Sequence, residues 1–296
     1  MTFSVVIPVH NKEAYIARSI ESVLAQEFQD FEILVVEDAS TDASARIIES
    51  LVDDRITIIK RFRPGPGGYL ARNEGADKAI GDWIVFLDAD DEWDRNHLST
   101  LDELISKYPK ADFLATGYRV CDGRRVKEVH VPYECSFSPC KALKRILHVD
   151  YIHTNSTCIR RSLYKRVEGF NTKMGWKRGG DTEFWLRLIS SARETAFSDK
   201  VTTTWKYDRS EITRANIPHD LQHPVITHLN SHSLSGFIHC QGVLKSYVFK
   251  KWLTWEVLRS KGFVRILWIA ILVPTHPIVS VRFFVDAIVR GLSRIW

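Results

Sequence analysis

Three carboxylates, Asp88, Asp90 and Asp91, directly follow a short apolar run. The run, residues 83–87, is too short for a typical helix but suits a buried strand. In an open α/β sheet, ligands bind just beyond the carboxyl ends of the strands. An Asp-x-Asp pair in that place can hold one hard divalent cation, such as Mg²⁺ or Mn²⁺, whose preferred partners are oxygens and phosphates. A polar turn is the alternative, since Asp is common in turns, but three acids after one apolar strand favour metal binding.

Polar residues also follow the two earlier apolar runs. Pro8 ends the first run, and because proline is poorly tolerated inside a central strand, we expect the chain to leave the sheet there. Asn11 and Glu13 would then lie in a shallow pocket at a helix start, unless they only cap that helix. Asp38 ends the second run, where carboxylates commonly bind a ribose or base edge, although an Asx turn is equally plausible. Arg72, on the helix before the acidic strand, could contact a base or a phosphate, or simply face solvent.

A fourth acid, Asp181, follows Gly179 and Gly180 at the start of an amphipathic segment. In isolation we interpret this acid as a helix cap that the helix dipole stabilises. The loop just upstream carries Trp176, which could close over a bound sugar. The residues alone therefore do not separate a cap from a carboxylate that acts on a ligand.

The first half of the chain alternates strands and helices, which predicts an α/β fold with a mostly parallel sheet covered on both faces. Beyond residue 94 the pattern becomes mixed. We expect strands at residues 3–9, 31–36, 56–59, 83–87, 111–120, 127–131, 156–160 and 201–207, and helices at about 13–26, around 47–51, at 69–79 and at 181–191.

The chain has 296 residues and a net charge of +5, and this charge is unevenly distributed. Residues 241–296 carry nine Lys and Arg against Glu256 and Asp286, so the first 240 residues are slightly acidic. A nucleic-acid binder would more often spread basic charge over its main domain, so no nucleic-acid partner is expected. We expect a catalytic domain at 1–240 and an appended helical region at 241–296.

The appended region combines its basic charge with four tryptophans, Trp252, Trp255, Trp268 and Trp296. Basic residues with aromatics indicate an anionic membrane surface as partner, and packing within a homo-oligomer is the alternative. The longest uncharged stretch without proline, residues 266–273, is far shorter than a membrane span. Because no signal peptide precedes the first strand, we expect a cytoplasmic protein, bound peripherally at the inner face of the cell membrane.

Five segments in order resemble the nucleotide-sugar glycosyltransferases of the large inverting family 2, which have the GT-A fold. The segments are residues 5–13, 34–42, 71–75, 86–91 and 180–188. One such motif is weak, but five in the right order and spacing are specific, and the resemblance covers roughly residues 3–210.

The resemblance implies roles for most of the residues above. The expected nucleotide contacts are Pro8, Val9, Asn11, Glu13, Asp38, Arg72 and Asp88. Asp88 and Asp90 would meet the diphosphate through Mn²⁺ or Mg²⁺. Asp181 falls where the family keeps its catalytic base, and Asp91, Trp176 and Gly180 would face the donor or acceptor sugar.

The chain departs from the family pattern in two places. The catalytic base is usually preceded by a second acid, but here that position is Gly180. The family often has a histidine soon after the late strand, whereas this chain has residues 207–210 without one. Arg209 or Arg214 would then contact the diphosphate instead.

These features predict a metal-dependent inverting glycosyltransferase. Asp181 would take the proton of the attacking acceptor hydroxyl, and a metal would offset charge on the leaving diphosphate. The expected donor is a nucleoside diphosphate sugar, a UDP-sugar by preference, and the expected acceptor is a glycan or lipid-linked glycan in cell-surface polysaccharide synthesis. The alternatives are a polyprenyl-phosphate sugar synthase, which needs no acceptor base, and a non-catalytic nucleotide-sugar binding module.

Overall fold

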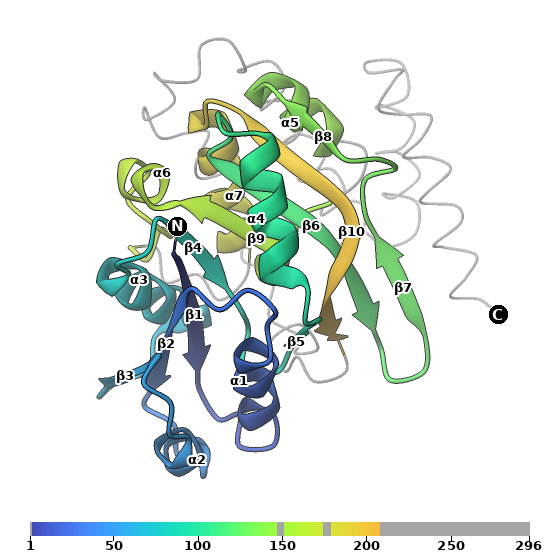
Figure 1. The fold of residues 1–296 in the computed structure, drawn as a ribbon. Helices are drawn as coiled ribbons and strands as arrows, with labels where there is room; N and C mark the ends of the chain where they lie inside the picture. Colours follow the sequence, from blue (N-terminus) through green and yellow to red (C-terminus); the bar gives the residue numbers. More distant parts are fainter. Residues whose placement is uncertain (1, 147–150, 174–178, 208–296) are drawn as a thin grey trace, which may run out of the picture. The chain divides into compact units, whose positions relative to one another are not determined.

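The computed structural model describes residues 2–146, 151–173 and 179–207, which form one mixed sheet flanked by helices (Figure 1). The strands are β1 (Phe3–Val9), β2 (Phe31–Asp38), β3 (Ile56–Arg61), β4 (Trp83–Phe86), β5 (Glu92–Trp93), β6 (Phe113–Cys121), β7 (Val126–Val129), β8 (Cys135–Phe137), β9 (Thr157–Arg160) and β10 (Thr195–Lys206). The helices are α1 (Ile16–Leu24), α2 (Ser44–Ser50), α3 (Tyr69–Lys78), α4 (His97–Lys107), α5 (Pro139–Ile146), α6 (Arg161–Arg166) and α7 (Gly180–Ser191), with 3-10 turns η1 (Pro66–Gly68) and η2 (Thr154–Ser156).

The strand order is β3-β2-β1-β4-β9-β6-β10-β5, with β7 paired to β6 and β8 paired to β10. β1 pairs in parallel with β2 and β4, and β2 pairs in parallel with β3. Parallel pairs need a crossover connection, and α1, α2 and α3 supply it. The carboxyl ends of β1, β2 and β4 therefore lie at one edge of the sheet.

The second half of the sheet mixes strand directions. β9 runs antiparallel to both β4 and β6, so β6 has the same direction as β4. β10 is parallel to β6, and in Figure 1 the arrows of β1, β6 and β10 point to the lower part of the molecule. We call the edge formed by the carboxyl ends of β1, β2, β4, β6 and β10 the site edge, and the opposite one the amino edge.

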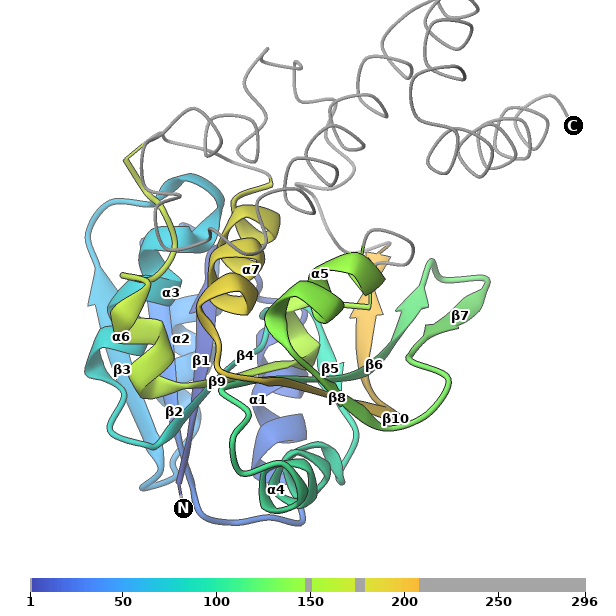
Figure 2. The same ribbon diagram turned by 90° about the horizontal axis from the view of Figure 1, so that it is seen from above.

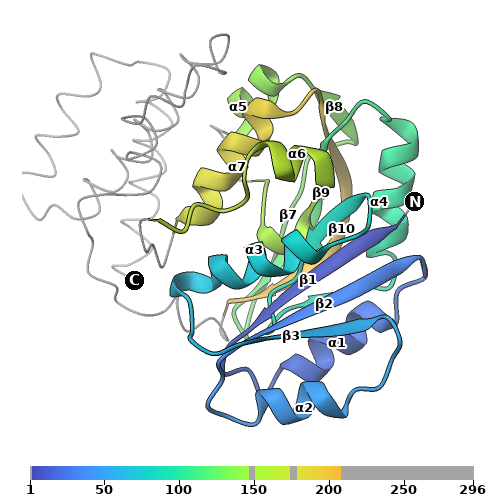
Figure 3. The same ribbon diagram turned by 90° about the vertical axis from the view of Figure 1, so that its left-hand side faces the viewer.

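One face of the sheet is covered by α1, α2 and α4. α1 buries Ile16, Ile20 and Val23, because its apolar residues recur at helical spacing. These side chains join one apolar core with alternate residues of the strands, such as Val5 and Ile7. Figure 3 shows α1 and α2 on one side of β1, β2 and β3, and α3 on the other.

The second face carries α3, α5 and α7. α3 lies so close to β1 that a Cβ at Gly75 would come within 2.5 Å of Val6 Cγ1. Phe170 packs on Phe184 of α7, with ring centroids 4.0 Å apart, and on Phe86 of β4, at 5.5 Å. Such aromatic pairs contribute beyond the area they bury, so they hold α7 against the sheet. Figure 2 shows α5 and α7 on one side of β6 and β9, with α4 on the other.

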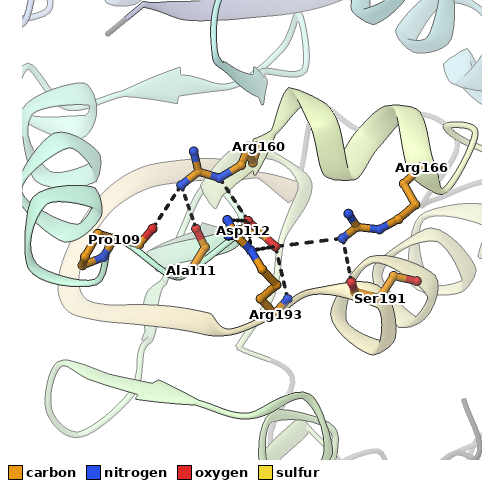
Figure 4. A network of polar contacts seen from close by, with 7 residues as sticks. All are labelled: Pro109, Ala111, Asp112, Arg160, Arg166, Ser191 and Arg193. Atoms are coloured by element: carbon orange, nitrogen blue, oxygen red, sulfur yellow. Dashed lines mark hydrogen bonds and ion pairs between the residues drawn. The ribbon is translucent and has the colours of Figure 1, made fainter.

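At the amino edge, Asp112 is surrounded by three arginines (Figure 4). Its side chain is 3% exposed and lies 3.0 Å from Arg160, 2.7 Å from Arg193 and 3.9 Å from Arg166. Burial raises the pKa of Asp112, but the hydrogen bonds and charge of Arg193, together with the charge of Arg160, lower it by more. The net pKa therefore lies below its ordinary value. This cluster connects the starts of β6 and β10 with the end of β9 and with α6.

The strand and helix pattern expected from the sequence is largely confirmed. β5, β8, α4, α5 and α6 were not predicted, and β10 begins at Thr195, well before the expected start at 201. β1 ends at Val9, the boundary expected from the sequence, so the chain leaves the sheet one residue after Pro8, which lies opposite Val36. Proline is tolerated there because β4 pairs with β1 only as far as Val6, so the missing N–H removes no ladder bond.

In the described ranges, none of the helices combines the length and the apolar character that crossing a bilayer requires.

Candidate active site

The three acids lie in the turn that joins β4 to β5, at the site edge. The N–H of Leu87 donates to the carbonyl of Val6 at 3.1 Å, which extends the pairing of β4 with β1 by one residue. The N–H of Asp91 then donates to the carbonyl of Asp88 at 3.0 Å, which closes the turn. The hydroxyl of Ser19 on α1 donates to the same carbonyl at 3.3 Å. The Asp-x-Asp pair therefore begins where the sequence predicts it.

Asp88 is paired with Arg72 of α3. Nη2 of Arg72 donates to Oδ1 of Asp88, and Nη1 donates to the carbonyl of Gly67 at 3.3 Å. Burial raises the pKa of Asp88, but the charge and hydrogen bond of Arg72 lower it more, with help from His153 and Lys12, so the net pKa is below its ordinary value. Asp88 is therefore a carboxylate held by a guanidinium.

Asp90 is less well compensated. Its only ion pair in the described residues is with Lys12, whose Nζ lies 2.9 Å from Oδ2. Burial and the charge of Asp88 raise the pKa of Asp90 more than Lys12 lowers it. A further positive charge next to Asp90 would stabilise its ionised form.

Asp91 is buried and bonded to the protein. Its carboxylate accepts from Nδ2 of Asn155 and, at 2.6 Å, from the N–H of Lys206. Oδ1 of Asn155 in turn accepts the N–H of Asp88 at 2.9 Å. Burial and the charges of Asp90 and Asp88 raise the pKa of Asp91 well above its ordinary value. Asp91 and Asn155 thus hold the acidic turn, and the predicted contact of Asp91 with a sugar stays a prediction.

Asn11 and Glu13 hold the loop that follows β2. Oδ1 of Asn11 accepts the N–H of Thr41 at 2.8 Å, and Oε2 of Glu13 accepts the N–H of Ala43 at 2.8 Å. Asn11 and Ala39 have φ angles of 51° and 53°, in the left-handed region. Strained backbone of this kind gathers at functional sites. The predicted nucleotide contacts of Asn11 and Glu13 stay predictions, and in the structure these side chains bond the loop after β2.

Asp38 lies at the end of β2 and is 2% exposed. Its carboxylate accepts from Nε of Arg61 at 2.6 Å and from the N–H of Gly65 at 3.0 Å. Arg61 also lies 2.8 Å from Glu74, and the ring of His10 contacts the Asp38 carbonyl at 2.8 Å. The sequence did not indicate Arg61, which lies outside the five segments, and gave no role to His10, which lies within the segment 5–13.

Asp181 is in the first turn of α7, as predicted. Gly179 before the helix has a left-handed φ of 78°, and Oδ1 of Asp181 accepts the N–H of Thr182 at 2.8 Å. The charge of Asp181 contributes to raising the pKa of Tyr69 and of Arg72, both on α3. Asp181 therefore lies within electrostatic reach of the arginine that binds Asp88.

Gly180 is tightly enclosed by Tyr69. A Cβ at this position would lie 2.9 Å from two carbons of the Tyr69 ring, and the N–H of Gly180 donates to the Tyr69 hydroxyl at 3.1 Å. The ring thus fills the space that a side chain at position 180 would need.

Aromatic residues flank the acidic turn on its other side. The ring of His153 stacks on Trp205 at 4.8 Å and lies 5.2 Å from Tyr118. Tyr207 packs edge-on against Trp205 at 5.3 Å and is 36% exposed. Because the N–H of Lys206 bonds Asp91, this aromatic group lies directly beside the acids.

Several predicted residues lie outside the described ranges. They are Trp176, Arg209, Arg214 and the whole basic region 241–296. Their expected roles stay predictions.

The described residues contain no group of three or more His, Cys, Asp and Glu side chains arranged to hold a metal. Asp88 and Asp90 nevertheless offer oxygen donors, which suit Mg²⁺ and Mn²⁺. The raised pKa of Asp90 fits a site that a cation would complete, with the remaining ligands coming from a bound diphosphate or water.

Comparison with known proteins identifies the family. The family model for glycosyl transferase family 2 matches residues 4–167, more than half of the chain. The chain therefore belongs to glycosyl transferase family 2, and the family and enzyme class expected from the five motifs are confirmed.

Two curated relatives illustrate the similarity. The chain is 32% identical over 139 residues to the putative teichuronic acid biosynthesis glycosyltransferase TuaG of Bacillus subtilis, covering 45% of this chain and 54% of that protein. It is 37% identical over 102 residues to the GalNAc(5)-diNAcBac-PP-undecaprenol beta-1,3-glucosyltransferase of Campylobacter jejuni, covering 33% and 32%. The chain spans between 16% and 54% of the length of the first four curated relatives it matches.

Among solved structures, the chain is similar to S. aureus TarS 1–349 in complex with UDP-GlcNAc. The TM-score is 0.65 at 24% identity, covering 73% of this chain and 62% of that one. This similarity confirms the GT-A fold.

Proposed function

We propose that this chain transfers a sugar from a UDP-sugar to a hydroxyl group of a glycan or lipid-linked glycan, in one displacement that inverts the anomeric carbon. The observation that carries this proposal is the position of Arg72. Its guanidinium bonds Asp88, and its pKa responds to the charges of both Asp88 and Asp181. Arg72 thus pairs with Asp88 of the acidic turn and lies within electrostatic reach of Asp181, which supports one site for the diphosphate leaving group and the attacking hydroxyl.

The chain's own residues account for the main requirements of the reaction. Asp181, in the first turn of α7, accepts the proton of the acceptor hydroxyl as it attacks. Arg72 and Lys12 provide positive charge where the diphosphate would lie, since both already contact the acidic turn. A single displacement needs no covalent nucleophile.

Asp88 and Asp90 are the residues that would hold Mn²⁺ or Mg²⁺. When bound, the metal neutralises charge that develops on the leaving diphosphate. The raised pKa of Asp90 supports this assignment, because the buried carboxylate has one lysine as compensation among the described residues.

The names of the relatives support the donor and the pathway. TarS was solved with UDP-GlcNAc, which supports a uridine donor. TuaG and the Campylobacter jejuni enzyme are named for teichuronic acid biosynthesis and for an undecaprenol-linked glycan, which supports cell-surface polysaccharide synthesis.

The aromatic group supports a glycan acceptor. Trp205 and Tyr207 lie beside the acidic turn, and aromatic rings pack well on the apolar C–H faces of sugars. A polyprenyl phosphate acceptor would not require such rings, nor a general base.

Asp181→Asn tests the function directly. The amide keeps the shape and the capping ability of Asp181 but cannot take the proton, so turnover of the UDP-sugar should fall about a hundredfold or more. UDP affinity should hardly change. Asp54→Asn, at an exposed acid outside the five motif segments, is the matched control and should keep full turnover. Undiminished activity of Asp181→Asn would favour a phosphate acceptor and overturn the proposal.

We also propose that residues 241–296 bind an anionic membrane surface. Nine Lys and Arg and four Trp support this, since each basic residue contributes about 1 kcal/mol near such a surface. The full chain should float with vesicles that contain anionic lipid and be partly released by salt. A chain ending at His239 should stay in solution. If the full chain ignores vesicles and the shorter one aggregates, the region is a packing or oligomer interface instead.

A further inference from the structure

Tyr69 and Gly180 fit each other closely. The Tyr69 side chain is 5% exposed, and its hydroxyl accepts the N–H of Gly180 at 3.1 Å. A Cβ at Gly180 would lie 2.9 Å from the ring, closer than unstrained carbon atoms approach. The residue directly before Asp181 is therefore held by a side chain from a distant helix, α3.

The Tyr69 hydroxyl also lies within electrostatic reach of Asp181. Burial and the charge of Asp181 raise the pKa of Tyr69, more than Arg72 and the backbone N–H groups of Gly180 and Asp181 lower it. The hydroxyl therefore stays protonated. In the hydrogen bonds of the described residues it acts only as an acceptor.

We propose that Tyr69 is a positioning residue for Asp181: its hydroxyl accepts the N–H of Gly180 and so holds the first turn of α7, which carries Asp181. Tyr69 takes the space that a second acid at position 180 would occupy. The inference rests on the proposed function, in which Asp181 is the general base.

The place of Tyr69 on α3 strengthens this assignment. Tyr69 and Arg72 are three residues apart, so their side chains share one face of the helix. Arg72 binds Asp88, while Tyr69 binds the start of α7. The stacking of Tyr69 on Phe170 at 5.5 Å fixes the ring. One helical turn thus sets the position of the base relative to the acidic turn.

The first test is Tyr69→Phe, which removes the hydroxyl and keeps the ring. With the UDP-sugar that the natural chain turns over fastest, we expect kcat, measured as UDP release, to fall about tenfold. The KM for this donor should not change.

Tyr164→Phe is the matched control. Tyr164 is also buried, donates to Asn73 of α3 at 2.9 Å and packs against Phe184 of α7, but it does not contact Gly180. It should lose thermal stability without a change in kcat. If Tyr69→Phe behaves in the same way, Tyr69 is only structural and the inference is overturned.

Asp181→Asn separates this inference from the proposed function. If Tyr69 acts through Asp181, adding Tyr69→Phe to Asp181→Asn should cause little further loss, because the two effects are not additive. Full activity of Asp181→Asn alone would overturn the proposed function. Alternatively, Asp181→Asn is nearly inactive while Tyr69→Phe has no effect of its own or adds its full effect in the double variant. That result would overturn only the inference about Tyr69.

The close packing is tested without catalysis. Gly180→Ala should lower the melting temperature in the otherwise natural chain, because the new Cβ meets the Tyr69 ring. In the Tyr69→Ala background the same change should cost much less. Equal losses in both backgrounds would show that Tyr69 does not occupy that space.

Discussion

Two charged clusters lie at opposite edges of the same sheet, and their carboxylates are balanced in opposite ways. At the amino edge, the single charge of Asp112 faces three arginines, and its pKa is lowered. At the site edge, the charges of Asp88, Asp90 and Asp91 face Arg72 and Lys12, and the pKa values of Asp90 and Asp91 are raised.

The difference separates a structural cluster from a functional one. Three arginines surround the single negative charge of Asp112, so this carboxylate is compensated and stabilises the folded chain without a ligand. Among the described residues, the ion pairs of the three acids at the site edge are with Arg72 and Lys12, two positive side chains for three carboxylates. Concentrating carboxylates there has a cost in stability that a bound cation would remove. Substitutions at the site edge should therefore change turnover and ligand binding, whereas substitutions at the amino edge should change stability.

The largest effect is expected from Asp90→Asn. The amide should abolish UDP-sugar turnover and the Mn²⁺-dependent part of UDP binding, because it removes one of the two acids that would hold the metal. The melting temperature without ligand should stay the same or rise by up to about 2 °C, roughly half a kcal/mol, because ionising Asp90 has a cost in the folded chain. A thermal-shift series with UDP, with and without Mn²⁺, measures both. Full turnover in EDTA would contradict the metal assignment.

Asp112→Asn should do the reverse. Arg160 and Arg193 would lose their carboxylate partner, and because both are partly exposed we expect a loss of about 2 kcal/mol rather than the larger cost of a fully buried pair. Equilibrium urea unfolding measures the loss. The folded variant should retain its kcat and its UDP affinity. A large drop in kcat in the folded variant would contradict the conclusion that the amino edge affects stability and not catalysis.

The site edge could be found in the sequence because its acids follow the strands that deliver them. Asp38 follows β2, Asp88 follows β4, and the apolar runs before them are visible in the chain. Their partners were not predictable: Asn155 lies 64 residues from Asp91 and Lys206 lies 115 residues from it. Those contacts depend on which strands become neighbours, and no local pattern encodes that.

The amino edge was missed for the same reason. Asp112 precedes β6, whereas Arg160 ends β9 and Arg193 precedes β10. In the sequence, each of these residues is an ordinary charged residue next to a strand, and nothing around it indicates its partners. Only the antiparallel insertion of β9 between β4 and β6 brings them together.

The pH dependence of stability should distinguish the two edges. The folded pKa of Asp112 is lowered, so its contribution is complete above the unfolded pKa of about 3.9 and is lost as pH falls through the folded value. The stability difference between the natural chain and Asp112→Asn should therefore be constant above pH 5 and shrink below pH 4.

Asp90→Asn should show the opposite trend. Because the folded pKa of Asp90 is raised, ionising it in the folded chain has a cost that appears as pH rises from about 4 through the folded value. The stability of the variant relative to the natural chain should therefore improve over that range. Urea unfolding between pH 3 and 7 measures both series, and parallel curves for the two variants would contradict the comparison.

The smallest expected effect is at Ala39, directly after Asp38. Its φ of 53° is left-handed, which costs an L-residue about 1–2 kcal/mol, while glycine adopts it freely but loses more chain entropy on folding. Ala39→Gly should therefore stabilise the chain by about 0.5–1 kcal/mol, or roughly 2 °C in melting temperature. UDP affinity should fall less than threefold, because the loop gains freedom.

Ala142→Gly, in the buried part of α5, is the control for this change. Ala142 has a helical backbone, so glycine there should destabilise the chain by about 1 kcal/mol. Opposite signs for the two alanine-to-glycine changes would show that the site edge stores backbone strain as well as uncompensated charge. If Ala39→Gly also destabilises, the loop after β2 is held by its contacts with Asn11 and Glu13, and the excess cost at the site edge is electrostatic alone.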